Sequence, residues 1–224
     1  MPILFFGDSE GFLDSSLKIV TVGLNPSLSE FPPSAPFSRF PDWDGEDGAS
    51  GSMDSLPSYL LSLDNYFRRE PYRRWFDPSY EPVLRGMSAS YYSVERPVLH
   101  TDICSPLATD PTWSRLGPEQ RALGVSGLSL WHDLIDCLQP DIALVSVARM
   151  HLNAIRFPRI GDDRTLHVVD RKNPYEVTGR RVLLHSGKSM VVVFGRAANT
   201  PMGTVSALEK ERIGRSILEA MGER

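Results

Sequence analysis

The fold is decided by the stretch Lys18-Ile19-Val20-Thr21-Val22-Gly23-Leu24-Asn25-Pro26-Ser27. After Lys18 its first residues are apolar or β-branched without alternation, a pattern typical of a strand buried on both faces. Gly and Asn-Pro then indicate a tight turn, because these residues favour turn conformations and proline cannot continue a central strand. The sequence therefore predicts a buried strand over 18–22 that runs directly into a loop.

Outward from this stretch, strand-like and helix-like segments alternate along the chain. Strands are predicted over 96–103, 141–147, 164–169, 177–185 and 190–194, and helices over 57–69, 128–138, 150–155 and 204–221. Such alternation predicts a mainly parallel central sheet covered by helices on both faces. We therefore expect a single α/β domain over residues 1–224, with three α/β/α layers and a loop rich in Pro, Gly, Ser and acidic residues at about 27–53.

The place of a functional site follows from this architecture. In open parallel sheets, ligands bind beyond the carboxyl ends of the strands. That rule indicates the loops after Val22, Ile103 and Phe194, which we expect to form one site.

Composition excludes several classes of protein. No apolar run reaches the roughly 18 residues that span a bilayer, and the apolar N-terminus lacks the basic segment of a signal peptide. The two cysteines, Cys104 and Cys137, form no Cys-x-x-Cys pair, so a disulfide framework, a zinc site and an iron–sulfur cluster all lack ligands. We expect a cytoplasmic protein with reduced thiols, no metal and no membrane partner.

The net charge of −4 is unusual for a protein that binds nucleic acid. However, five of the 28 acidic residues lie in the stretch 42–54, which contains no Lys or Arg. Without them, 24 Lys and Arg stand against 23 Asp and Glu, and several basic residues cluster at 68–74, 171–172 and 180–181. A local basic face is therefore compatible with the composition.

The N-terminal stretch 3–9 ends in Gly7-Asp8-Ser9, which resembles the nucleophile block of the Gly-Asp-Ser esterases. Those enzymes also carry a late Asp-x-x-His pair, because an unassisted serine hydroxyl is a weak nucleophile. The positions three residues before the five histidines hold Pro, Ser, Ala, Arg and Val. The expected base is missing, so the stretch is interpreted as a strand and turn, and an esterase is kept as an alternative.

The stretch Val20 to Ser27 resembles the uracil-DNA glycosylase superfamily, whose mismatch-specific branch carries a Gly-x-Asn-Pro-Gly loop after its first core strand. Gly23, Asn25 and Pro26 match this loop, and Ser27 replaces its last glycine. The resemblance covers most of the chain as an order of elements, but only this first motif is close in sequence.

Two further segments fit the same order of elements. The segment 98–102 corresponds to an apolar strand that ends in a base-reading Asn in uracil-specific members, and Asp102 stands at that position here. The segment 191–201 corresponds to a strand followed by a Ser/Pro-containing loop. Its Asn199-Thr200-Pro201 approximates a His-Pro-Ser-Pro motif but lacks the His that stabilises the departing base in some branches.

The resemblance implies a DNA glycosylase that needs no cofactor. Asn25 would position the attacking water, and the backbone of the loop would bind the leaving base. Phe37 or Phe40 would stack on that base, and Met202 would fill the gap left in the duplex. The remaining residues expected at the site contact the base or the DNA: Gly23, Leu24, Pro26, Ser27, Asp102, Arg196, Asn199, Thr200 and Pro201.

Asp102 is the most informative departure from the family pattern. An ionised carboxylate only accepts hydrogen bonds and suits the 4-amino group of cytosine, so a cytosine or modified cytosine is the hypothesis for the base. Some bacterial defence glycosylases that resemble this superfamily attack modified phage cytosines, which is an analogy for a role other than DNA repair. The expectation is a monomer that acts on DNA; a nucleoside hydrolase and a non-catalytic nucleic-acid-binding protein remain alternatives.

Overall fold

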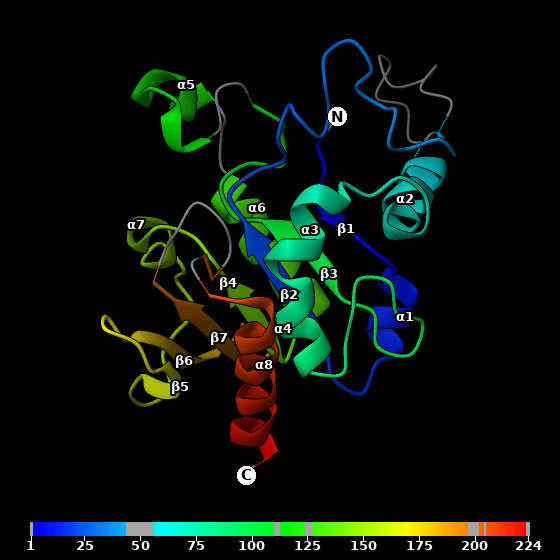
Figure 1. Cartoon of the computed structure of the whole chain (residues 1–224). Coiled ribbons are helices and arrows are strands. Elements are labelled where there is room, and N and C mark those ends of the chain that lie inside the picture. The colour runs from blue at the N-terminus through cyan, green and yellow to red at the C-terminus, as the bar shows by residue number, and fades with distance from the viewer. Residues whose placement is uncertain are drawn as a thin grey trace.

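A computed structural model describes residues 2–43, 56–109, 113–123, 127–196, 202–203 and 205–222. Within these residues the chain forms one sheet with helices on both of its faces (Figure 1). The strands are β1 (Phe5–Phe6), β2 (Ile19–Gly23), β3 (Leu99–Asp102), β4 (Ile142–Val145), β5 (Arg164–Val169), β6 (Tyr175–Leu183) and β7 (Ser189–Gly195).

The order of the strands across the sheet is β1-β3-β2-β4-β7-β6-β5. The central four, β3, β2, β4 and β7, are parallel, whereas β1, β6 and β5 pair antiparallel with their neighbours. The short turn between β5 and β6 requires an antiparallel hairpin, since parallel neighbours need a long crossover. The predicted α/β class is therefore confirmed, while the prediction of a mainly parallel sheet is correct only for the four central strands.

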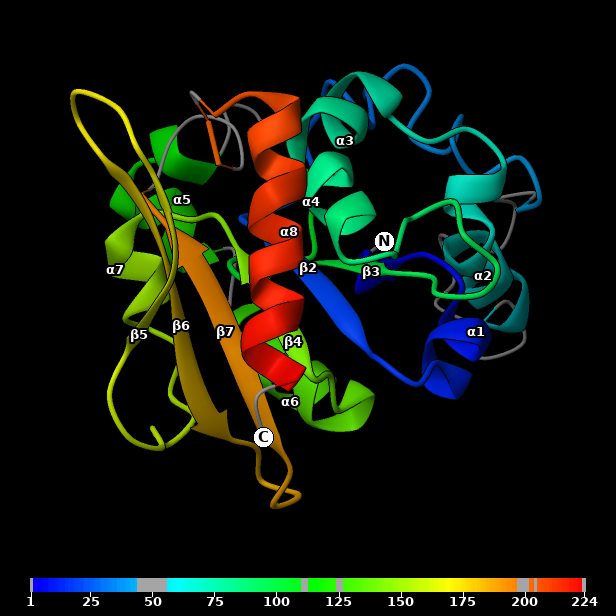
Figure 2. The same cartoon turned by 60° about the horizontal axis from the view of Figure 1, so that its bottom comes forward.

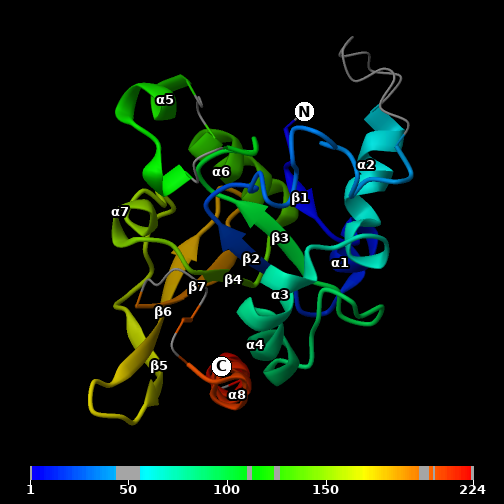
Figure 3. The ribbon, with the colours of Figure 1, turned by 45° about the horizontal axis from the view of Figure 1, so that its top comes forward.

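Helices cover both faces of this sheet. Helices α3, α4 and α8 lie on one face and α6 lies on the other, while α1 and α2 flank the β1 edge (Figure 3). The helices are α1 (Ser9–Asp14), α2 (Leu56–Asp64), α3 (Arg73–Ser79), α4 (Glu81–Gly86), α5 (Pro118–Leu123), α6 (Gly127–Leu138), α7 (Arg149–Leu152) and α8 (Ala207–Gly222), with 3₁₀ turns at Tyr66–Arg68 and Trp113–Arg115.

The side chains of β3 alternate between the two faces, as the pleat of a strand requires. Thr101 points towards α6, where its hydroxyl oxygen accepts a hydrogen bond of 3.1 Å from the indole N–H of Trp131. His100 points the other way and packs against Trp75 and Phe76 of α3. Polar groups of β3 are therefore placed at fixed positions on both faces of the sheet.

Helices α4 and α8 approach each other at backbone distance. A Cβ at Gly214 would collide with the carbonyl oxygen of Val83, and one at Gly86 would collide with that of Glu211. Next to this contact, the buried ammonium of Lys210 donates to the carbonyls of Pro78 and Ser79, which end α3. These contacts join α3, α4 and α8 into a single layer, because the free carbonyls at a helix end need partners when buried.

Several predicted elements agree with the structure within a few residues. The helix expected over 57–69 is α2 followed by a 3₁₀ turn, and the strand over 164–169 is β5 with the same bounds. Among the described residues, no helix is long and apolar enough to cross a membrane.

Candidate functional site

Gly23 and Asp102 end two neighbouring parallel strands and are paired in register. A Cβ on Gly23 would lie 2.5 Å from Asp102 Oδ1 and 3.1 Å from His100 Nε2. The absence of a side chain at Gly23 thus leaves the space that the carboxylate of Asp102 occupies over the end of β2. The side chain of Asp102 is only 5% exposed.

Polar side chains continue from Asp102 into the interior on the same face. His100 Nε2 lies 3.7 Å from Asp102 Oδ1, and His100 Nδ1 lies 2.8 Å from the hydroxyl of Thr21. The Thr21 hydroxyl is 2.6 Å from that of Tyr91. Buried polar groups are costly unless paired, so this chain of contacts fixes the ring of His100 beneath Asp102.

The loop after β2 is tied along its length to the segment after β3. Backbone N–H groups of Ile103 and Cys104 donate to the carbonyls of Gly23 and Leu24, at 3.1 and 2.9 Å. Further on, Ser27 forms an isolated parallel bridge with Thr109. The two loops that the sequence predicts to share a site therefore run side by side.

The Asn25 side chain connects these two loops. Its Nδ2 donates to the hydroxyl of Thr109 at 2.8 Å and to the carbonyl of Pro26 at 2.7 Å. Its Oδ1 accepts a hydrogen bond of 3.3 Å from the backbone N–H of Trp113. These contacts set the orientation of the amide, with its oxygen directed towards the segment that contains Trp113.

Glu30 is a buried carboxyl group close to the same loop that is not among the residues predicted for the site. It is 6% exposed, and its Oε1 accepts a hydrogen bond from the hydroxyl of Tyr66. Burial raises the pKa of Glu30 to about 8, against the lowering effect of the Tyr66 hydrogen bond; Asp102 raises it and Arg39 lowers it. No motif indicated this group, because its burial depends on the aromatic residues around it.

The two rings predicted to stack on the base, Phe37 and Phe40, pack against neighbouring aromatic residues. Phe40 is 2% exposed and stacks on Phe31, which in turn stacks on Phe6. Phe37 is only partly buried and meets Trp43 edge-on, with ring centroids 4.4 Å apart. Phe40 is therefore a core residue in this conformation, whereas Phe37 keeps an exposed part.

The loop after β7 is described only in part. Arg196 is exposed, and its carbonyl accepts a hydrogen bond of 3.3 Å from the Tyr175 hydroxyl. Met202 is only 2% exposed, so its side chain is packed inward in this conformation. Its backbone has a φ of 49°, in the left-handed region. The predicted contact residues 199–201 lie outside the described residues. Strand β4 separates β2 from β7, so the end of β7 at Gly195 lies at the same end of the sheet as the Asn25 loop but does not adjoin β2.

A cavity of about 300 Å³ lies beside the Asn25 loop on the α6 face of the sheet. Its lining includes Ile103, Trp113, Leu128 and the pair Cys104 and His151, whose Sγ and Nδ1 are 3.3 Å apart. Burial raises the pKa of the Cys104 thiol to about 12 and lowers that of His151. The thiol is therefore protonated near neutral pH, which disfavours a nucleophilic role. Spacing along the sequence gave no signal for this pair.

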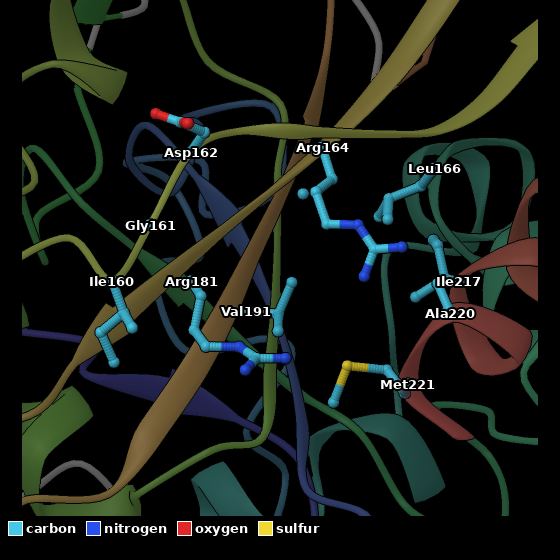
Figure 4. A pocket seen from close by; sticks show the side chains of 11 residues that line it. Ile160, Gly161, Asp162, Arg164, Leu166, Arg181, Val191, Ile217, Ala220 and Met221 are labelled. Atoms are coloured by element: carbon cyan, nitrogen blue, oxygen red, sulfur yellow. The ribbon is translucent and has the colours of Figure 1, made fainter. Parts of the chain in front are cut away.

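A second cavity, of about 290 Å³, lies at the opposite end of the sheet. Figure 4 shows the side chains of Arg164 and Arg181 extending into it beside Met221 of α8. Ala220 and Met221, near the C-terminal end of α8, complete this side of the lining. This cavity is remote from Asn25 and Asp102.

Candidate metal ligands do not gather in the part of the chain that the structure describes. There, no group of three or more His, Cys, Asp or Glu side chains is placed to hold a metal ion. Comparison with known proteins found no matching family model, no matching curated protein and no matching solved structure. The interpretation of the site therefore rests on its own chemistry.

Proposed function

We propose that this protein is a DNA glycosylase that hydrolyses the N-glycosidic bond of a flipped pyrimidine and leaves an abasic site. The observation that carries the proposal is the pairing of Gly23 with Asp102, which sets a carboxylate beside the Asn25 loop at the carboxyl edge of the sheet. The fold of the uracil-DNA glycosylase superfamily is part of this proposal. So is the assignment of the Gly-x-Asn-Pro motif to water positioning.

The proposed reaction needs an oriented water and donors for the departing base. The carbonyl oxygen of an amide has two lone pairs, and one on Asn25 Oδ1 is used by the N–H of Trp113. The second would accept a hydrogen bond from the attacking water and so aim the water oxygen at the sugar. An amide is a weak base, so the water is oriented while the sugar develops positive charge, rather than deprotonated beforehand.

Asp102 would read the base. A carboxylate accepts hydrogen bonds from an exocyclic amine and has no hydrogen to donate to the 4-oxygen of uracil. The low exposure of this side chain strengthens such a hydrogen bond, because competition from water is small. Cytosine or a modified cytosine is therefore the favoured substrate base, and Phe37 is the ring with free surface for stacking on it.

The esterase alternative is disfavoured by the position of Ser9. Ser9 begins α1, directly after β1. Because β1 runs antiparallel to β3, and β2 runs parallel to it, Ser9 lies at the opposite end of the strands from Gly23. Its backbone N–H donates to Asp64, and the neighbouring Asp8 is paired with Arg68. These contacts fit a structural turn.

Base release from defined DNA tests the proposal. Oligonucleotides containing cytosine, hydroxymethylated or glucosylated cytosine, uracil or mismatched thymine are incubated with the protein, and alkali then cuts at abasic sites. We expect cleavage of a substrate whose base carries an exocyclic amine. The rate of cleavage should fall by about 100-fold or more in Asn25→Ala. DNA that is bound but never cleaved would refute the enzymatic proposal.

Matched variants separate chemistry from loop structure. Thr109→Val removes a hydrogen bond to Asn25 Nδ2 but leaves Oδ1 in place, so it should retain most of the activity that Asn25→Ala loses. Asp102→Asn should shift the preference from bases with an exocyclic amine towards uracil. Unchanged selectivity in Asp102→Asn would show that another residue reads the base.

A further inference from the structure

The β5–β6 hairpin projects beyond the edge of the sheet at which the proposed site lies. Val177 of β6 pairs with Gly195, the last residue of β7, and the turn at 170–174 comes before β6 begins at Tyr175. The turn therefore extends past the end of β7, as its yellow ribbon shows in Figure 2. The register of β2, β4 and β7 places Val22, Val145 and Phe194 in one row across the sheet, so the turn and the Asn25 loop rise from the same edge.

Tyr175 holds two arginine-bearing segments together at this edge. Its hydroxyl donates to the carbonyl of Arg196 at 3.3 Å, and the guanidinium of Arg171 lies 5.5 Å from the centre of its ring. Gly195 makes this possible, since a Cβ there would overlap the Tyr175 hydroxyl. The Arg171 side chain is also braced by a hydrogen bond of 2.9 Å to the carbonyl of Asn173.

The charges at this edge are exposed and favour an anionic partner. Arg171, Lys172 and Arg196 all have exposed side chains. Glu176 follows Tyr175 on β6 and therefore points to the opposite face of the strand, although Asp170 remains beside the turn. Arg180 does not add to the group, because Asp163 pairs with it through both carboxylate oxygens, at 2.8 and 2.7 Å.

We infer that the β5–β6 hairpin, together with Arg196 at the end of β7, binds the phosphate backbone of the DNA strand. Arg171, Lys172 and Arg196 are the contacting residues, and Tyr175 is the positioning residue for Arg171 and Arg196. This inference rests on the proposed function for the identity of the partner. It adds a contact surface that β4 and β7 separate from β2, the strand that precedes Asn25. Phosphates are bound by such exposed guanidinium and ammonium groups without regard to base sequence.

The test measures binding of a fluorescein-labelled DNA oligonucleotide without a substrate base, by anisotropy from 50 to 300 mM salt. Each lost phosphate contact reduces the salt slope of log affinity by about 0.9, which corresponds to about eightfold weaker binding at 0.1 M salt. We expect a loss of about five- to tenfold in Arg171→Ala and again in Lys172→Ala. Arg181→Ala, which removes the same charge from the far end of β6, should change affinity by less than about twofold.

Tyr175→Phe tests the positioning role, since it keeps the ring but removes the hydrogen bond to Arg196. It should weaken DNA binding with little change in the salt slope. A lower free energy of unfolding with unchanged DNA affinity would show that Tyr175 is purely structural and would overturn its assigned role. Equal effects of Arg171→Ala and Arg181→Ala would overturn the hairpin contact. Tighter binding of RNA of the same sequence would overturn DNA as the partner.

These measurements also separate the inference from the proposed function. Wild-type protein that binds and cleaves DNA, with the hairpin variants unaffected, overturns the hairpin contact alone. Binding that depends on the hairpin but yields no abasic sites supports the contact and refutes the glycosylase. No binding of DNA by the wild-type protein would overturn both.

Discussion

Replacing Glu30 by Gln should alter the pH dependence of stability in a defined direction. Burial raises the pKa of Glu30 from its ordinary value of 4.5 to about 8, so the folded protein holds this proton more tightly than the unfolded chain. The associated stability is fully present below pH 4.5 and is lost as the pH rises through about 8. Gln cannot ionise, so its contribution does not change over this range.

The magnitude follows from the size of the pKa shift. One pKa unit corresponds to about 1.4 kcal/mol, so the full shift is on the order of 5 kcal/mol. Between pH 5 and 8 the wild-type protein should lose about 1 kcal/mol of unfolding free energy per pH unit relative to Glu30→Gln. The Gln oxygen can still accept the Tyr66 hydrogen bond, which limits other effects of the substitution.

Urea unfolding followed by tryptophan fluorescence, at pH 5.5, 6.5, 7.5 and 8.5, measures this difference. Other titrating groups are common to both proteins and cancel. Tyr66→Phe provides a second arm: the Tyr66 hydrogen bond lowers the pKa of Glu30, so its removal should move the pH window upwards. A difference between wild type and Glu30→Gln that does not vary with pH would refute the reasoning.

Two glycine substitutions should be costly at positions of close approach. Gly23→Ala sets a methyl group 2.5 Å from Asp102 Oδ1 and should destabilise the protein by about 1–3 kcal/mol in urea unfolding, with base release reduced more strongly than DNA binding. A fully active Gly23→Ala protein would show that Asp102 does not need its present position. Gly214→Ala forces a methyl group into the carbonyl of Val83 and should cost about 3 kcal/mol while leaving base selectivity unchanged. A thermal melt close to that of the wild type would contradict backbone contact between α4 and α8.

The parts of the fold that the sequence predicts are those with local signals. The stretch 18–22 contains no polar alternation, and it forms β2 with four fully buried residues before Gly23. Helices α3 and α4 gave no such signal, because each is short and contains a proline, at Pro78 and Pro82. Their helical structure depends on tertiary contacts, including the backbone contact of α4 with α8.

The candidate site divides in the same way. The turn residues Gly23 and Asn25 are recognisable because their conformational preferences are local. Glu30, in contrast, is an ordinary loop residue in the sequence, and its raised pKa arises from partners such as Tyr66, which is 36 residues away. Likewise, the spacing of Cys104 and His151 does not indicate that a strand end and α7 bring them together.

The segment after Asn25 is part of the core rather than a loose lid, and this bears on how a weakly basic amide could support catalysis. The backbone carbonyl of Ser27 accepts hydrogen bonds from the N–H groups of Glu30 and Phe31, which closes a turn directly after Pro26. Phe31 then enters the aromatic cluster with Phe40. An amide that only orients water must hold its geometry in advance, since it contributes little driving force for proton transfer. Packing of this segment supplies that rigidity, so the chemistry proposed for Asn25 depends on the aromatic cluster.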